Sequence, residues 1–128
     1  MGGGVALFLG ALDTRIAFVC SSGAVCSYRH KRDHGVPLEM SLVIPSFATQ
    51  FDVADLLRCI APRAVLVVSA EEDPASGDAF DVVREARTAF EAVKANEQLA
   101  HLHVPGGHGL DKRRFDAIVE WAAERTHR

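Results

Sequence analysis

The chain has 128 residues, of which 48% are hydrophobic and 24% charged, and its net charge is −3 with the histidines neutral. This size predicts a single globular domain that buries a modest core without disulfides or a structural metal. The composition excludes disordered, collagen-like and coiled-coil chains, and the slight negative charge gives no general attraction for nucleic acid or anionic membranes, so we expect neither as a partner.

The three cysteines, Cys20, Cys26 and Cys59, are an odd number and lack the spacing of a disulfide framework or a zinc site. This usage is typical of a reducing compartment, so we expect a cytoplasmic protein. The longest uncharged stretches, residues 1–12 and 16–28, are shorter than the roughly 20 residues that span a bilayer. No basic residue precedes the first stretch, so we expect neither a signal peptide nor a membrane span.

Three segments have the length and pattern of β-strands. Residues 16–20 and 64–68 are continuous apolar runs, a pattern typical of strands covered on both faces, so we expect both to be central in a parallel sheet. In residues 99–104 apolar and polar side chains alternate, with His101 and His103 on one side. This alternation predicts a less buried strand near an edge of the sheet.

Helical periodicity fills the segments between and after these strands. The first helix has Asp52 as its N-cap, ends before Pro62, and presents one apolar face made of Val53, Leu56, Leu57 and Ile60. Two longer helices are predicted, with the inner faces Phe80, Val83, Ala86, Phe90 and Val93 for one, and Phe115, Ile118, Val119 and Ala122 for the other. Strands that alternate with helices predict an α/β fold, with one domain over residues 1–128 and helices flanking a three-stranded parallel sheet.

Residues 21–50 are the least regular part of the chain and form an irregular excursion between strands, punctuated by Gly23, Gly35, Pro37 and Pro45. Long loops of this kind often line ligand sites, but they also occur without that role. Both interpretations of the excursion therefore stay open.

Two loops at the carboxyl ends of predicted strands carry groups suited to acid–base chemistry. The strand 64–70 runs into the acidic residues Glu72 and Asp73, and the strand 99–104 runs into a glycine-rich loop around His108. In a parallel sheet such loops meet at one edge, where ligands bind. A carboxylate on Nδ1 holds an imidazole in one tautomer and stabilises its protonated form, so Asp73 and His108 are a candidate catalytic pair, with Glu72 as the alternative acid.

A series of short motifs covers nearly the whole chain: Gly-Gly-Gly at 2–4, Ala-Leu-Asp-Thr-Arg-Ile at 11–16, Phe-Asp-Val-Ala-Asp-Leu at 51–56, Ile-Ala-Pro-Arg at 60–63, Glu-Glu-Asp-Pro at 71–74 and Pro-Gly-Gly-His-Gly at 105–109. In these motifs and their order the chain resembles the C-terminal half of an α/β-hydrolase of the dienelactone hydrolase and acetyl xylan esterase type. The resemblance implies a partial α/β-hydrolase fold and a serine hydrolase. Such an enzyme acts on carboxylic esters or related acyl bonds of a small molecule and needs no cofactor.

In that family the catalytic triad follows the order Ser, acid, His, and Asp73 and His108 match its second and third members. The family's nucleophile lies in a G-x-S-x-G motif, and Met1 matches the residue just after that serine, so the resemblance implies a chain that lacks the nucleophile. We expect such a truncated hydrolase to be inactive in isolation, because loss of a triad nucleophile costs on the order of 10⁶ in rate. The absence of earlier strands leaves the strand 16–20 unpaired along one edge, which favours self-association.

Other functional interpretations have less support in the sequence. His101, His103 and His108 are candidate metal ligands, but no carboxylate or cysteine pattern accompanies them, so we expect no metal. The three cysteines are expected to be buried structural thiols, and Ser21 and Ser22 lack a nucleophile motif. A non-catalytic remnant and a small binding module that uses the irregular excursion remain the alternatives to a hydrolase.

Overall fold

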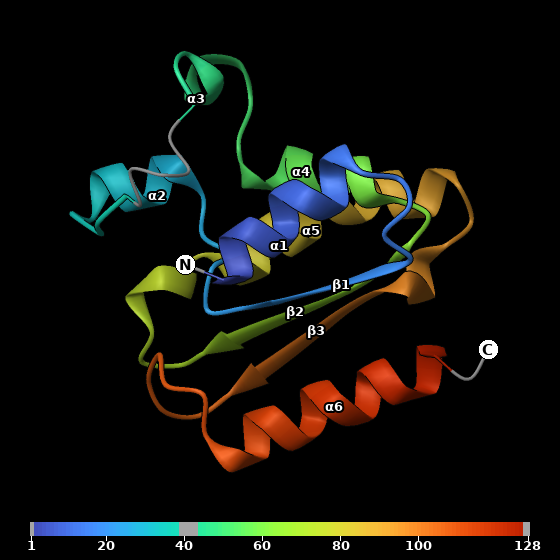
Figure 1. The fold of residues 1–128 in the computed structure, drawn as a ribbon. Helices are drawn as coiled ribbons and strands as arrows, with labels where there is room; N and C mark the ends of the chain where they lie inside the picture. Colours follow the sequence, from blue (N-terminus) through green and yellow to red (C-terminus); the bar gives the residue numbers. More distant parts are fainter. Residues whose placement is uncertain (1, 39–43, 127–128) are drawn as a thin grey trace.

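The computed structural model describes residues 2–38 and 44–126. At its centre is a parallel sheet with the strand order β1-β2-β3, where β1 is Phe18–Ser22, β2 is Ala64–Ala70 and β3 is Leu99–Val104 (Figure 1). The predicted α/β class and the three-stranded parallel sheet are confirmed.

The strand β1 begins two residues later than the sequence predicts, and the expectation that it is central was wrong for the described sheet. Within the described residues it pairs only with β2, from Phe18 beside Ala64 to Ser22 beside Val68. Burial alternates along β1, since Val19 is buried while Phe18 is only partly covered. By contrast, β2 is buried at all 7 positions and is the central strand.

Helices cover both faces of the sheet (Figure 1). The helices α1 (Gly2–Leu12), α4 (Val53–Ile60) and α5 (Ala79–Ala92) lie on one face, and α6 (Lys112–Thr126) lies on the other. The main core lies between the sheet and the first three helices, and its buried side chains include Leu7, Leu57, Ile60, Val65, Val67 and Phe90.

The remaining elements are short. The helices α2 (Tyr28–Asp33) and α3 (Phe47–Gln50) lie in the irregular excursion, and residues 39–43 of that excursion fall outside the described residues, as does Met1. The 3₁₀ turn η2 (Pro74–Ser76) precedes α5, and the 3₁₀ turn η3 precedes β3 at Asn96–Gln98. None of the helices in the described ranges is long and apolar enough to span a membrane.

The helix α4 forms where the sequence predicts it. Asp52 is its N-cap, the Asp52 carboxylate accepts the N–H of Val53, and the Asp55 carboxylate accepts the N–H of Asp52 in return. This reciprocal capping satisfies N–H groups that the helix itself leaves unpaired. The predicted apolar face of α4 is buried.

The predicted inner face of α5 is confirmed at Val83, Ala86 and Phe90, which are buried, but it was wrong at its two ends. Phe80 is 60% exposed and Val93 is 51% exposed, whereas Ala79 and Val82 are buried. The ring of Phe80 lies over the ring of His101, with 4.6 Å between their centroids. The aromatic residue at the start of α5 therefore packs on the polar part of β3 and not in the core.

The inner face of α6 was predicted correctly only in part, since Ile118 and Ala122 are partly covered. Phe115 is 52% exposed and Val119 is 48% exposed, and the one fully buried residue of the helix is the charged Arg114. The apolar pattern misleads here because Arg114 occupies an inward position through hydrogen bonds to the neighbouring loop. Trp121 takes another inward position and packs edge-on against Phe18 of β1.

Candidate active site

The loops after β2 and β3 lie side by side at the carboxyl ends of the strands. The N–H of Glu71 donates to the carbonyl oxygen of Val104 at 3.0 Å, and the N–H of Glu72 donates to that of Gly106 at 3.0 Å. These hydrogen bonds continue the pairing of β2 with β3 beyond the strands. They bring the acidic loop against the glycine-rich loop that carries His108.

The structure brings the side chains of Asp73 and His108 together. The Nδ1 atom of His108 lies 3.1 Å from both Oδ1 and Oδ2 of Asp73. The Asp73 side chain is 1% exposed, whereas that of His108 is 60% exposed. Because an ionised carboxylate only accepts hydrogen bonds, Nδ1 carries the proton of a neutral imidazole in this position, which leaves Nε2 with its lone pair. Within the described residues Nε2 has no hydrogen-bond partner.

The buried carboxylate of Asp73 has further donors around it. Oδ1 accepts the N–H of Ala75 at 3.0 Å, and Oδ2 accepts the hydroxyl of Ser76 at 3.2 Å. Both donors belong to η2, for which Asp73 is the N-cap. A buried charge requires such partners to offset its desolvation, and the turn therefore fixes the carboxylate beneath the imidazole.

Gly23, which follows β1, packs against this pair. Its φ angle is 64°, and a Cβ at this position would lie 2.9 Å from Cε1 of His108 and 3.2 Å from Oδ2 of Asp73. The sequence indicates Gly23 only as a break in the irregular excursion. Its contact with His108 and Asp73 joins segments that are distant in the sequence, so no local sequence pattern predicts this role.

A pocket of about 70 Å³ lies beside the imidazole of His108. The pocket lies among α1, α2, α4 and the loops at this edge, and it is lined by Gly4, Leu7, Phe8, Gly23, Ala24, Tyr28, Lys31, Pro37, Val53, Leu56, Ala75 and His108. Part of the irregular excursion therefore borders the pocket.

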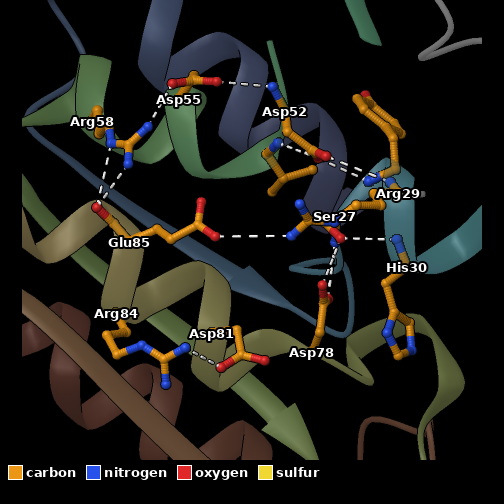
Figure 2. Close-up of polar contacts among 12 residues, drawn as sticks. Ser27, Arg29, His30, Asp52, Asp55, Arg58, Asp78, Asp81, Arg84 and Glu85 are labelled. Atoms are coloured by element: carbon orange, nitrogen blue, oxygen red, sulfur yellow. Dashed lines mark hydrogen bonds and ion pairs between the residues drawn. The ribbon is translucent and has the colours of Figure 1, made fainter. Parts of the chain in front are cut away.

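Two carboxylates hold the start of α2, which forms one wall of this pocket (Figure 2). Asp78 accepts the N–H of Ser27 at 2.9 Å and its hydroxyl at 2.5 Å, and Asp52 accepts the N–H of Tyr28 at 2.8 Å. The first turn of a helix has unpaired N–H groups and a partial positive charge, so it favours such partners. Burial raises the pKa of Asp78, but the hydrogen bonds from Ser27 outweigh this and hold it below the usual value.

The alternative acid Glu72 and its neighbour Glu71 are exposed, and the structure gives neither carboxylate a hydrogen bond to His108. Both residues act through their main-chain N–H groups, which tie the two loops together. Of the acids in this loop, Asp73 alone has the geometry of a partner for His108 among the described residues.

The structure does not bring His101 and His103 together with His108. Both face the buried hydroxyl of Ser69, which lies 2.7 Å from Nε2 of His101 and 2.8 Å from Nδ1 of His103. Burial lowers the pKa of His101, and the charges of His103 and Arg87 add to this effect. In the described parts of the chain, no group of three or more His, Cys, Asp or Glu side chains is placed to hold a metal ion.

The cysteines and serines flagged in the sequence have other environments. Burial raises the pKa of the Cys20 thiol to about 11. Burial is also the largest cause that raises the pKa of the Cys26 thiol to about 11. Both thiols are therefore poor nucleophiles at neutral pH. The expectation that Cys59 is buried was wrong, because it lies on the outer side of α4 and is exposed. The Ser21 hydroxyl is buried and donates to the carbonyl oxygen of Gly3 at 3.0 Å, and the Ser22 hydroxyl makes no hydrogen bond to His108.

No protein-family model and no curated protein sequence matches the chain. Solved structures do match. The chain is similar to a carbohydrate esterase family 15 glucuronoyl esterase from Caldicellulosiruptor kristjansonii, with a TM-score of 0.74 and 18% identity over 93% of this chain and 39% of that one. It is also similar to the glucuronoyl esterase catalytic domain from Hypocrea jecorina, with a TM-score of 0.74 and 16% identity over 97% and 41% of the two chains.

A third similar structure is a Bacteroides fragilis protein described as an acetyl xylan esterase, with a TM-score of 0.66 and 17% identity over 92% of this chain and 38% of that one. The fold is part of an α/β-hydrolase fold. The chain spans about two fifths of the length of these structures. The fold expected from the sequence motifs is therefore confirmed.

Proposed function

We propose that this chain carries the acid and the general base of an α/β-hydrolase-type serine hydrolase that acts on carboxylic esters or related acyl bonds. The observation that carries the proposal is the contact between the buried Asp73 carboxylate and Nδ1 of the exposed His108. A carboxylate in this place fixes the tautomer in which Nε2 accepts a proton. Similarity of the fold to that of several esterases supports the choice of an acyl bond as the target.

In the proposed reaction the nucleophile is a serine hydroxyl outside the described residues. Nε2 of His108 takes the hydroxyl proton while the oxygen attacks the acyl carbon, and the protonated imidazole then gives this proton to the leaving alcohol. In the second half of the reaction, Nε2 takes a proton from water while the water oxygen attacks the acyl carbon of the acyl-enzyme. The proton then passes to the serine oxygen, which releases the carboxylic acid and restores the serine. The Asp73 carboxylate holds the ring in place and stabilises the imidazolium that forms twice in each cycle.

Two measurements test the proposal. The first is the reading frame upstream of the Met1 codon, where we expect a Gly-x-Ser triplet, as the sequence motifs imply. The second is hydrolysis of p-nitrophenyl acetate, together with labelling by a serine-reactive fluorophosphonate, in the full protein encoded by that frame. A full protein that neither takes up the label nor hydrolyses the ester would contradict the proposal and favour a non-catalytic remnant.

A small binding module is the alternative, and the pocket beside His108 is the observation that favours it. The ligand expected here is a short acyl compound, represented in the test by two short-chain carboxylates. Thermal unfolding in the presence of acetate and butyrate tests this function, because a ligand that binds only the native state raises the Tm. The absence of a shift with either compound would exclude it for these ligands.

The proposal also includes a cytoplasmic location. Its support is the state of the three cysteines, Cys20, Cys26 and Cys59, which are all free thiols. Free thiols persist in a reducing compartment. Fractionation of cells that express a tagged protein tests this part directly, and recovery of the protein in a secreted or periplasmic fraction would contradict it.

A further inference from the structure

Arg114 is a buried charged residue next to the candidate active site. It lies on α6, is 2% exposed and makes no ion pair with a carboxylate of the described residues. Its Nε atom is buried and has no hydrogen-bond partner there. A buried guanidinium without a carboxylate is costly, so general stability does not explain why an arginine occupies this position.

The two other nitrogens of the guanidinium bind the main chain of the histidine loop. Nη1 donates to the carbonyl oxygen of His108 at 3.0 Å, and Nη2 donates to that of Gly107 at 2.8 Å. These carbonyl groups belong to successive residues, so the planar guanidinium fixes the direction of the peptide units on both sides of the His108 Cα atom. A single-point donor such as lysine cannot fix both.

The loop has little stiffness of its own. Gly106, Gly107 and Gly109 surround His108, and Gly106 has a φ angle of 85°. Glycines lose more conformational freedom on ordering than other residues. On the strand side the loop is held at Gly106 by the N–H of Glu72, whereas the main chain at His108 itself is held by Arg114.

Arg114 is in turn held at the start of α6. Its N–H donates to Oδ1 of Asp111 at 2.8 Å, which caps the first turn of the helix. The helix packs on the sheet face opposite α1, α4 and α5 (Figure 1). The guanidinium therefore links the loop to a rigid element that takes no other part in the site.

We propose that Arg114 is the positioning residue for His108. By holding the carbonyl groups of Gly107 and His108, it keeps the imidazole where Nδ1 donates to Asp73, so that Nε2 keeps its lone pair. The importance of this for catalysis rests on the proposed function, but the effect on the imidazole is measurable without any substrate.

The test is nitrogen-15 NMR of the His108 ring at a pH where the imidazole is neutral, in the wild-type chain and in Arg114→Met and Arg114→Lys. Arg113→Met is the matched control, because Arg113 is the exposed neighbour on the same helix. The wild type and Arg113→Met are expected to populate the Nδ1–H tautomer. Both Arg114 variants are expected to populate a mixture with the Nε2–H tautomer, and exchange of the Nδ1 proton with water should accelerate about tenfold or more.

Circular dichroism establishes whether each variant is folded. A folded Arg114→Met or Arg114→Lys protein with wild-type ring nitrogen shifts and a wild-type exchange rate overturns the proposal. If both variants fail to fold, the proposal is tested in the wild type by the rate at which the guanidinium protons of Arg114 exchange with water. The protons of Arg114 should exchange at least about tenfold more slowly than those of Arg113, and equal rates would overturn the proposal.

A negative ester hydrolysis assay leaves these NMR outcomes intact, so failure of the proposed function is distinguishable from failure of this inference.

Discussion

Gly23 and His108 are in such close contact that no larger residue fits at position 23. A Cβ there would lie 2.9 Å from Cε1 and 3.0 Å from Nδ1 of the imidazole, and the φ angle of Gly23 is 64°. The turn after β1 thus supports the imidazole ring from the side, while Asp73 supports it through Nδ1.

Gly23→Ala is expected to destabilise the protein and to displace the imidazole. The left-handed backbone alone costs an L-residue about 1–2 kcal/mol, and the clash with the ring adds to this. The matched control is Gly35→Ala, since Gly35 has a φ angle of 65° but open space around its Cα atom. Urea unfolding and the NMR resonances of His108 check this prediction. Equal stability losses and an unmoved His108 in both variants would contradict it.

The anchor of α2 on Asp78 predicts a loss of stability in acid. The pKa of Asp78 lies below its ordinary value of 3.8 in the folded state. A depressed carboxyl pKa contributes stability that is fully present above the unfolded value and is lost as the pH falls through the folded value. We therefore expect Asp78→Asn to flatten the acid limb of the stability curve below about pH 4, as measured by urea unfolding at several pH values.

Asp81→Asn is the control for this experiment. Asp81 is exposed and pairs with Arg84 at the surface (Figure 2). Surface pairs of this kind contribute about 0–1 kcal/mol. If the two variants lose the same fraction of their pH dependence, the carboxylate of Asp78 is not the anchor of α2.

The free edge of β1 predicts self-association of the chain. Within the described residues β1 pairs on one side only, and an unpaired apolar edge invites pairing with another copy. We expect the apparent mass in light scattering to rise with concentration, and Ala17→Lys to suppress this rise, because Ala17 is exposed and directly precedes β1.

Thr14→Lys is the control, because it makes the same change of charge at an exposed position outside the strand. A wild type that stays monomeric at all concentrations would contradict self-association. An equal effect of both lysines would show that net charge, and not the edge, governs it.

Local pattern is enough to predict much of this fold. A largely apolar run with β-branched residues is sufficient to predict β2, and a cap followed by one apolar face is sufficient to predict α4. The buried faces of α5 and α6 are only partly predictable in the same way. Phe80 packs on His101 and Arg114 binds the histidine loop, and both contacts depend on which segments the topology brings together.

The residues of the candidate site also fall into two groups, those that the sequence predicts and those that it does not. Asp73 and His108 each follow a strand of a parallel sheet, so their meeting at one edge follows from the general geometry of such sheets. The roles of Gly23 and Arg114 require the distance between a loop and the imidazole to within about an ångström, and no local sequence signal carries that information. The anchor of α2 on Asp52 and Asp78 is likewise a contact between distant segments.

The measurement that tests the central claim most directly is the kcat for ester hydrolysis by His108→Ala and Asp73→Asn in the full protein. Both values should fall by about 10⁴-fold or more, because His108→Ala removes the proton acceptor and Asp73→Asn removes the group that sets its tautomer. Glu72→Gln, which changes an exposed neighbour in the same loop, should keep the wild-type kcat. Near-wild-type turnover in either His108→Ala or Asp73→Asn would contradict the assignment of that residue to the catalytic site.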